Sequence, residues 1–142
     1  LRNDNLGRAK MASDLTNAGT LVLWAAAAYN IGFAIFHLLF WRLFRWPDGL
    51  HSSGKLNTAI TQTLNIMLIY CFALYGATLI WAAMASITLP HLVLIAGAGF
   101  WLFRAALQPL LFSMRTGPSV CMAVVFLAGA GLHTLGALVA LN

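Results

Sequence analysis

Acidic residues are nearly absent from this sequence. It contains no glutamate, and its only aspartates, Asp4, Asp14 and Asp48, lie outside the long apolar runs. Acid catalysis, proton relay and carboxylate-bridged metal pairs inside a membrane all need a carboxylate among the apolar segments. The sequence therefore argues against these three kinds of chemistry within its apolar part.

The chain also has little cysteine. Cys71 and Cys121 stand far apart and show no CxxC spacing. Cysteine zinc sites rely on closely spaced pairs, and we place these two residues at different depths, which argues against a disulfide. We therefore expect neither a cysteine zinc site nor a disulfide.

Charged residues make up only 8% of the chain, whereas 61% of its residues are hydrophobic. Soluble domains average about 25% charged residues, so this composition indicates an integral membrane protein that contacts membrane lipids. The net charge of +5 would also suit a nucleic-acid partner. The basic residues stand at the ends of apolar runs and form no basic stripe, so we expect no contact with nucleic acid.

Four apolar runs are each long enough to cross a bilayer as an α-helix. They cover about residues 20–44, 57–84, 91–112 and 119–141. The segment 47–55 has the proline, glycine and serine of a turn, and the two later loops are short, so consecutive helices should be antiparallel neighbours. The sequence predicts one all-α domain over residues 1–142, an integral membrane bundle of four transmembrane helices in up-down-up-down order.

Lysine and arginine gather in the first and third loops and are missing from the second. Basic loops stay on the cytoplasmic side of a membrane, which predicts that both termini lie outside (N-out, C-out). The three basic residues before Met11 predict the opposite orientation. They do not count towards the orientation if translation begins at Met11. The basic side chains of the two loops are Arg42, Arg45, Lys55 and Arg115.

Polar side chains inside the apolar runs fall into layers of depth. At 1.5 Å per helical residue, His37, Asn65 and Arg104 lie roughly 10 to 12 Å from the predicted cytoplasmic helix ends. We interpret these residues and their shallower polar neighbours as one polar cluster that can bind a ligand. The predicted cluster consists of Arg104, Gln108, His37, Asn65, Thr61 and Gln62.

A second polar pair is expected in the outer half of the bundle. Asn30 and His133 both fall at a depth of about 21 Å, where they can hydrogen-bond to each other. Gly129 and Gly136 share a face with His133 and form a small-residue surface suited to close helix packing.

Arg104 is the most informative single residue, because a guanidinium at this depth is costly to bury and no acid in the apolar runs can neutralise it. Its candidate partners are backbone carbonyls, amide side chains, a lipid phosphate reached by snorkelling, an acidic partner subunit or an anionic ligand. Pro109 cannot donate to the carbonyl of Ala105 and predicts a kink beside Arg104. A snorkelling arginine in a packed bundle is the alternative interpretation.

Histidine is the remaining candidate ligand for a metal or a haem. The estimated depths of His37 and His133 differ by about 11 Å, which is unsuited to a haem held by both. His51 and His91 lie at loop or interface positions and share no ligand spacing with the others. We therefore predict no metal, no haem and no other cofactor.

Several short runs resemble a group of small bacterial four-helix membrane proteins. They are residues 30–37 (NIGFAIFH), 40–42 (FWR) and 100–104 (FWLFR), together with Asn57 and Asn65 between them. The resemblance covers most of the chain. It implies a four-helix fold and a bacterial inner-membrane location, and it implies no particular activity.

A weaker resemblance is to the MAPEG enzymes (membrane-associated proteins in eicosanoid and glutathione metabolism), which are trimers of four-helix subunits. Asn57 can occupy the asparagine of that family's Arg-Ala-x-x-Asn-x-x-Glu run, and Arg104 is similar to its helix-three arginine. Ser53, Gly54 and Ile60 stand where the family has Arg, Ala and Glu. The resemblance implies a glutathione-dependent or lipid-modifying membrane enzyme.

Two functions therefore remain open. Small size, short loops and the lack of a catalytic carboxylate favour a non-catalytic accessory or assembly subunit of a larger membrane complex, which contacts other membrane subunits or further copies of itself. The alternative is a MAPEG-like enzyme whose polar cluster binds an anionic head group. No catalytic residue can be assigned. A small-anion transporter is less favoured, because the four predicted helices show no internal repeat.

Overall fold

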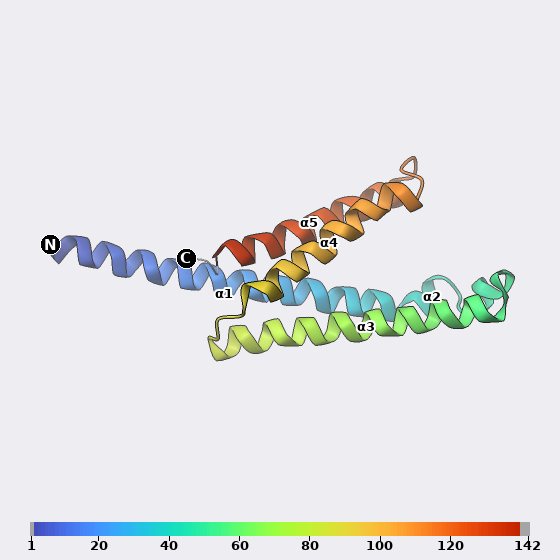
Figure 1. Ribbon diagram of the computed structural model, residues 1–142, viewed down its shortest axis with the longest axis horizontal. Coiled ribbons are helices and arrows are strands. Elements are labelled where there is room, and N and C mark those ends of the chain that lie inside the picture. The colour runs from blue at the N-terminus through green and yellow to red at the C-terminus, as the bar shows by residue number, and fades with distance from the viewer. Residues whose placement is uncertain (1, 140–142) are drawn as a thin grey trace. The chain divides into compact units, whose positions relative to one another are not determined.

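The computed structural model describes residues 2–139, and within this range the chain is helical with no strand (Figure 1). This confirms the predicted all-α class. The elements are α1 (Arg2–Leu38), α2 (Phe40–Leu43), the 3₁₀ helix η1 (Asp48–Ser53), α3 (Gly54–Ala85), α4 (His91–Leu111) and α5 (Gly117–Val139).

Four segments of the described range are long and apolar enough to cross a membrane: Leu6–Leu38, Asp48–Ala85, His91–Leu111 and Gly117–Val139. At 1.5 Å per residue, the 21 residues of α4 extend about 32 Å and the 23 residues of α5 about 35 Å. A bilayer's hydrocarbon core is about 30 Å thick. These lengths are compatible with a multi-pass membrane protein.

The first helix differs most from the predicted span. α1 begins at Arg2 instead of near residue 20 and has 37 residues, or about 56 Å. Residues 2–19 contain no proline and many good helix formers, so the helix continues beyond the apolar run. The amide of Leu39 donates to the carbonyls of both Ile35 and Phe36, at 3.1 Å each, and α2 follows directly.

Side chains at the start of α3 donate hydrogen bonds to backbone carbonyls of the connection between α2 and α3. Arg45, two residues before Pro47, has a left-handed φ of 51°, and η1 follows. The hydroxyl of Thr58 donates to the carbonyl of Leu50 at 3.0 Å, and the Asn57 amide donates to the carbonyl of Ser53 at 2.9 Å. The predicted turn segment is therefore an ordered loop that ends where α3 begins.

The chain forms two compact units: a first unit of Leu1–Ala26 with Ala82–Asn142, and a second unit of Ala27–Trp81. The boundaries fall inside α1 and inside α3, so each of these helices contributes to both units.

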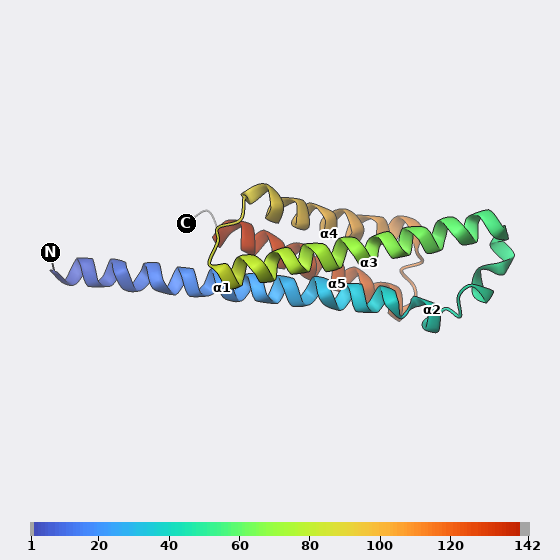
Figure 2. The ribbon, with the colours of Figure 1, turned by 90° about the horizontal axis from the view of Figure 1, so that it is seen from below.

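The second unit is an antiparallel helical hairpin of α1 and α3, which lie side by side along this stretch (Figures 1 and 2). The rings of Phe33 and Phe72 pack with centroids 5.7 Å apart. A Cβ on Gly76 would lie 2.8 Å from the side chain of Ile31 and 3.3 Å from the carbonyl oxygen of Ala27. The absence of a side chain at Gly76 therefore sets how closely the two helices approach.

The first unit contains a second antiparallel hairpin, formed by α4 and α5, with the N-terminal part of α1 against α5 (Figure 1). Trp101, which is 1% exposed, stacks on Phe126 with ring centroids 6.1 Å apart. A Cβ on Gly19 would lie 3.3 Å from Val139, and one on Gly136 would lie 3.4 Å from Val22. These glycines allow α1 and α5 to pack closely.

Candidate functional site

Arg104 lies on α4 in the first unit and is half-buried. One terminal guanidinium nitrogen donates a hydrogen bond of 2.9 Å to the side-chain oxygen of Gln108, one helical turn further on. This i, i+4 pairing follows from helix geometry, which places the two side chains on one face.

Two aromatic rings also contact the guanidinium of Arg104. Its central carbon lies 4.2 Å from the ring centroid of Phe126 on α5 and 5.5 Å from that of Phe112 at the end of α4. Both distances are within the range of cation–π contacts, which are stronger where water is excluded. The positive charge of Arg104 is therefore held by a neutral amide and two ring faces.

Gln108 connects Arg104 to the first turn of α5. Its side-chain nitrogen donates to the hydroxyl of Ser119 at 2.9 Å and approaches the carbonyl of the same residue at 3.4 Å. The Ser119 hydroxyl in turn lies 3.6 Å from the sulfur of Met114. We call Arg104, Gln108, Ser119, Phe112 and Phe126 the Arg104 network.

The network leaves Arg104 with donor capacity. A guanidinium carries five N–H donors, and the structure gives Arg104 a single hydrogen bond, to Gln108, within the described residues. The aspartates of the chain are at positions 4, 14 and 48, so neither α4 nor α5 carries a carboxylate. Arg104 thus meets no acid on its own hairpin.

The second unit holds a separate polar pair between α1 and α3. The Asn65 amide nitrogen donates to the backbone carbonyl of His37 at 3.0 Å, and its oxygen lies 2.7 Å from His37 Nδ1. Because an amide oxygen only accepts, His37 Nδ1 must carry the hydrogen. Asn65 is 3% exposed and uses both ends of its side chain to join the two helices.

Aromatic rings surround His37 as well. Its imidazole stacks on Phe40 with centroids 4.5 Å apart, and Phe72 lies at 5.4 Å. Nearby, the indole nitrogen of Trp41 donates to the side-chain oxygen of Gln62 at 3.2 Å. Thr61 is half-buried next to Gln62 and takes part in neither of these hydrogen bonds.

The predicted outer pair is divided between the units. His133, in the first unit, is fully buried, and its Nδ1 donates to the carbonyl of Gly129 at 2.7 Å. Asn30 is buried in the second unit. Their hydrogen bond to each other stays a prediction.

The larger predicted cluster is divided in the same way. The structure brings Arg104 and Gln108 together in the first unit, and it brings His37 and Asn65 together in the second, where Gln62 bonds to Trp41. A single cluster that joins both groups stays a prediction. Pro109 lies in the last turn of α4, two residues before the helix ends, and the kink expected there also stays a prediction.

The side chains that the structure describes include no group of three or more histidine, cysteine or acidic residues that could hold a metal ion. Cys71 and Cys121 are exposed free thiols.

Sequence reasoning missed three members of the Arg104 network. Ser119, Phe112 and Phe126 lie on the facing helix or at a helix end, and a single sequence gives no register between two helices. Ser119 begins the fourth apolar run, at the same end of the α4–α5 hairpin as Gln108, which was the one available signal. Phe126 is one of nine phenylalanines, and nothing in the sequence distinguishes it from the others.

The described fold is thus a pair of helical hairpins with four helices long and apolar enough to span a membrane. Comparisons with protein-family models, with curated proteins and with solved structures found no match to this chain.

Proposed function

We propose that the chain is a multi-pass protein of a bacterial inner membrane, with four spans in up-down-up-down order and both termini outside. Large apolar side chains cover its outer surface: Leu92, Leu110 and Val124 are 75%, 76% and 60% exposed. Exposed apolar surface of this kind marks contact with lipid or with a partner. The basic residues of the α2–α3 and α4–α5 connections support the orientation through the positive-inside rule.

Within that membrane we propose a non-catalytic accessory or assembly subunit of a larger complex. The observation that carries this proposal is the incomplete pairing of Arg104, a half-buried cation that uses one of its five donors on an amide. Intramembrane arginines pair with an acid or with backbone carbonyls from a neighbouring element. An acidic side chain of another subunit would complete the Arg104 network.

The composition of the chain points to a different protein as that subunit. A second copy would bring no glutamate, and its aspartates at positions 4, 14 and 48 lie outside the apolar runs. A homo-oligomer therefore leaves Arg104 without an acid at its own depth, whereas a hetero-complex can supply one.

The other polar side chains support a structural role. His37 with Asn65, and Gln108 with Ser119, pair across helices and occupy their hydrogen-bonding groups with each other. Interhelical hydrogen bonds of this kind hold membrane helices together. The described residues contain no buried side-chain nitrogen or oxygen that lacks a hydrogen-bond partner. These buried polar groups therefore stabilise the fold.

The test compares the full chain with two variants after extraction in mild detergent. Arg104→Gln keeps a hydrogen-bonding side chain but removes the charge, and Arg115→Gln is the matched control, since Arg115 is an exposed arginine of the next loop. Native mass spectrometry should find a stoichiometric membrane partner with the wild type and Arg115→Gln, and should lose it with Arg104→Gln. Neutralising one intramembrane acid of that partner should cause the same loss. A wild-type protein that is always alone, or joined only to itself, would contradict the proposal.

The MAPEG-like enzyme is the second candidate, because the same spare donors suit the carboxylates of glutathione or a lipid head group. Millimolar glutathione would then raise the melting temperature of the wild type and leave that of Arg104→Gln unchanged. The accessory role predicts no shift for either protein.

A further inference from the structure

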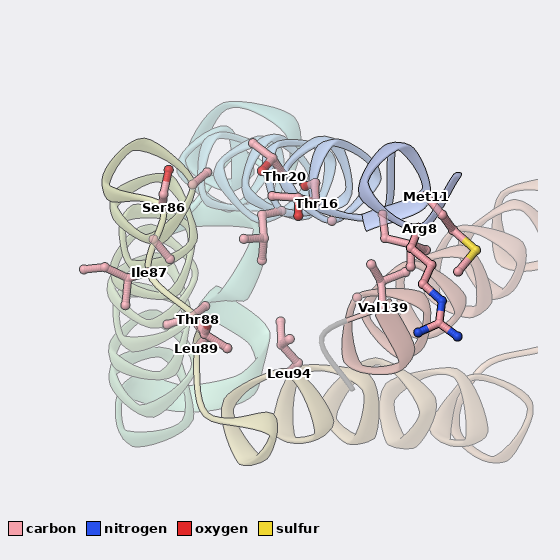
Figure 3. Close-up of a pocket in the computed structure, with 16 residues that line it drawn as sticks. Arg8, Met11, Thr16, Thr20, Ser86, Ile87, Thr88, Leu89, Leu94 and Val139 are labelled. Atoms are coloured by element: carbon pink, nitrogen blue, oxygen red, sulfur yellow. Dashed lines mark hydrogen bonds between the residues drawn. The ribbon is translucent and has the colours of Figure 1, made fainter. Parts of the chain in front are cut away.

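A groove of about 480 Å³ opens in the first unit at the end of the α4–α5 hairpin that lies away from Arg104 (Figure 3). Its walls are the N-terminal part of α1, the end of α3, the residues between α3 and α4, the first turn of α4 and the last turns of α5. The volume lies within the range of small-molecule sites. No residue of the Arg104 network lines it, and neither does His37 or Asn65.

The lining residues of α1 recur every three or four positions and so form one face of the helix. They run from Leu23 through Gly19, Leu15 and Met11 to Arg8, with Thr16 and Thr20 beside them. The distance along the helix from Leu23 to Arg8 is about 22 Å. This face is mainly apolar, with two threonines in its middle and its one charged residue, Arg8, at the N-terminal end.

The floor of the groove is apolar. Buried Leu89 and Leu94 lie opposite α1, and Figure 3 shows both side chains directed into the groove. The Thr20 hydroxyl donates to the carbonyl of Thr16 in its own helix, at 3.1 Å. Thr20 therefore needs no polar group from an occupant, and an aliphatic chain can lie against it.

Arg8 is the one charged side chain among the residues that line the groove. It is exposed, and Figure 3 shows it on the same side of the groove as Val139, at the end of α5. Among the described side chains that line the groove, none is acidic. Most of the other lining residues are apolar, and the polar ones, Thr16, Thr20, Ser86 and Thr88, carry uncharged hydroxyls. A mainly apolar groove with a single cation at its rim matches a molecule with an aliphatic chain and one negative head group.

We propose that the groove binds an anionic phospholipid of the surrounding bilayer, with its phosphate at Arg8 and one acyl chain along α1 towards Leu23 and Leu94. The inference rests on the membrane insertion proposed above and is independent of the accessory role. The stretch of α1 that is long and apolar enough to span a membrane begins at Leu6, so Arg8 lies at the level where this span meets the lipid head groups. A free inorganic anion would leave the apolar floor unoccupied, and a zwitterionic lipid would make less use of Arg8.

The experiment titrates the full chain, in detergent, with phosphatidylglycerol and with phosphatidylcholine of the same acyl chains, and counts bound lipids by native mass spectrometry. The wild type should prefer phosphatidylglycerol. Arg8→Gln should reduce this preference about fivefold, because one basic residue near a membrane surface contributes a factor of this size. Lys10→Gln, the control, removes an exposed cation of the same helix that does not line the groove and should keep the preference.

A second variant tests the groove itself. Thr20→Trp fills the channel and should reduce the binding of both lipids, without a loss of helical circular dichroism. A photoactivatable acyl chain should crosslink to residues 86–94 and 136–139 in the wild type. Equal affinity for the two lipids, or crosslinks spread evenly along all helices, would overturn the proposal. Failure of the protein to float with vesicles would instead refute membrane insertion, so the two failures are distinguishable.

Discussion

Asn65 and His37 hold α1 and α3 together through two hydrogen bonds, one to the imidazole and one to the backbone carbonyl of the same residue. The pair fixes both the register of the hairpin and the tautomer of the ring. Because the amide of Asn65 is buried, replacing it leaves the histidine donor without its acceptor.

We predict that Asn65→Leu lowers the free energy of unfolding by about 1 to 2 kcal/mol, since it removes two interhelical hydrogen bonds that contribute about 0.6 kcal/mol each in a membrane, and the part-buried imidazole donor loses its acceptor. Asn57→Leu is the control, because Asn57 is exposed and bonds only within its own turn. Unfolding of the purified protein in mixed micelles measures both. Equal effects of the two substitutions would mean that the pair does not stabilise the hairpin.

Gly76 provides a test of helix approach. Gly76→Ala places a methyl group 2.8 Å from Ile31 and 3.3 Å from the Ala27 carbonyl, so the helices must separate or the isoleucine must move. We expect a loss of about 1 to 3 kcal/mol, typical of an overpacked contact. The double variant Ile31→Ala, Gly76→Ala should recover part of that loss. Gly99→Ala should cost nothing comparable, because no atom lies within 4 Å of its new methyl group.

These contacts show what the sequence could and could not predict. The length of the apolar runs predicts the helices, and α4 begins at His91 as expected because Pro90 cannot continue a preceding helix. The sequence did not predict that α1 begins at Arg2. Hydropathy identifies the part of a helix that can lie in lipid, and it does not show where the helix itself begins or ends. Gly76 was not singled out, because its role depends on which residue faces it.

The candidate site shows the same division. Arg104 and Gln108 were predicted together because helix geometry alone fixes an i, i+4 pair. Their contacts with Ser119 and Phe126 depend on the register of α4 against α5, which depth counting gives only to within a turn. Depth counting also placed Arg104 of the first unit and His37 of the second unit at the same depth. Equal depth does not show whether two side chains are in contact.

Gln108 offers the clearest test of the Arg104 network. Gln108→Leu removes the acceptor of Arg104 and the donor to Ser119 at once, so we expect a loss of about 2 to 3 kcal/mol. Ser119→Ala should cost less, because the carbonyl of residue 119 still lies 3.4 Å from the glutamine nitrogen. Unfolding curves of both variants decide the order. A Ser119→Ala protein less stable than Gln108→Leu would mean that the hydroxyl, and not the glutamine, organises the network.

Membrane orientation can be tested at two serines. Ser86 and Ser113 are exposed and lie in the connections at the two ends of α4. With Cys71 and Cys121 replaced by alanine, each serine is changed to cysteine and probed in intact cells with a membrane-impermeant maleimide. The proposed N-out, C-out orientation places residue 86 outside and residue 113, beside Arg115, in the cytoplasm. We therefore expect Ser86→Cys to be labelled at once and Ser113→Cys only after the membrane is permeabilised. The reverse pattern would show that Arg2, Arg8 and Lys10 outweigh the loop charges, and it would move the Arg104 network to the outer half of the membrane.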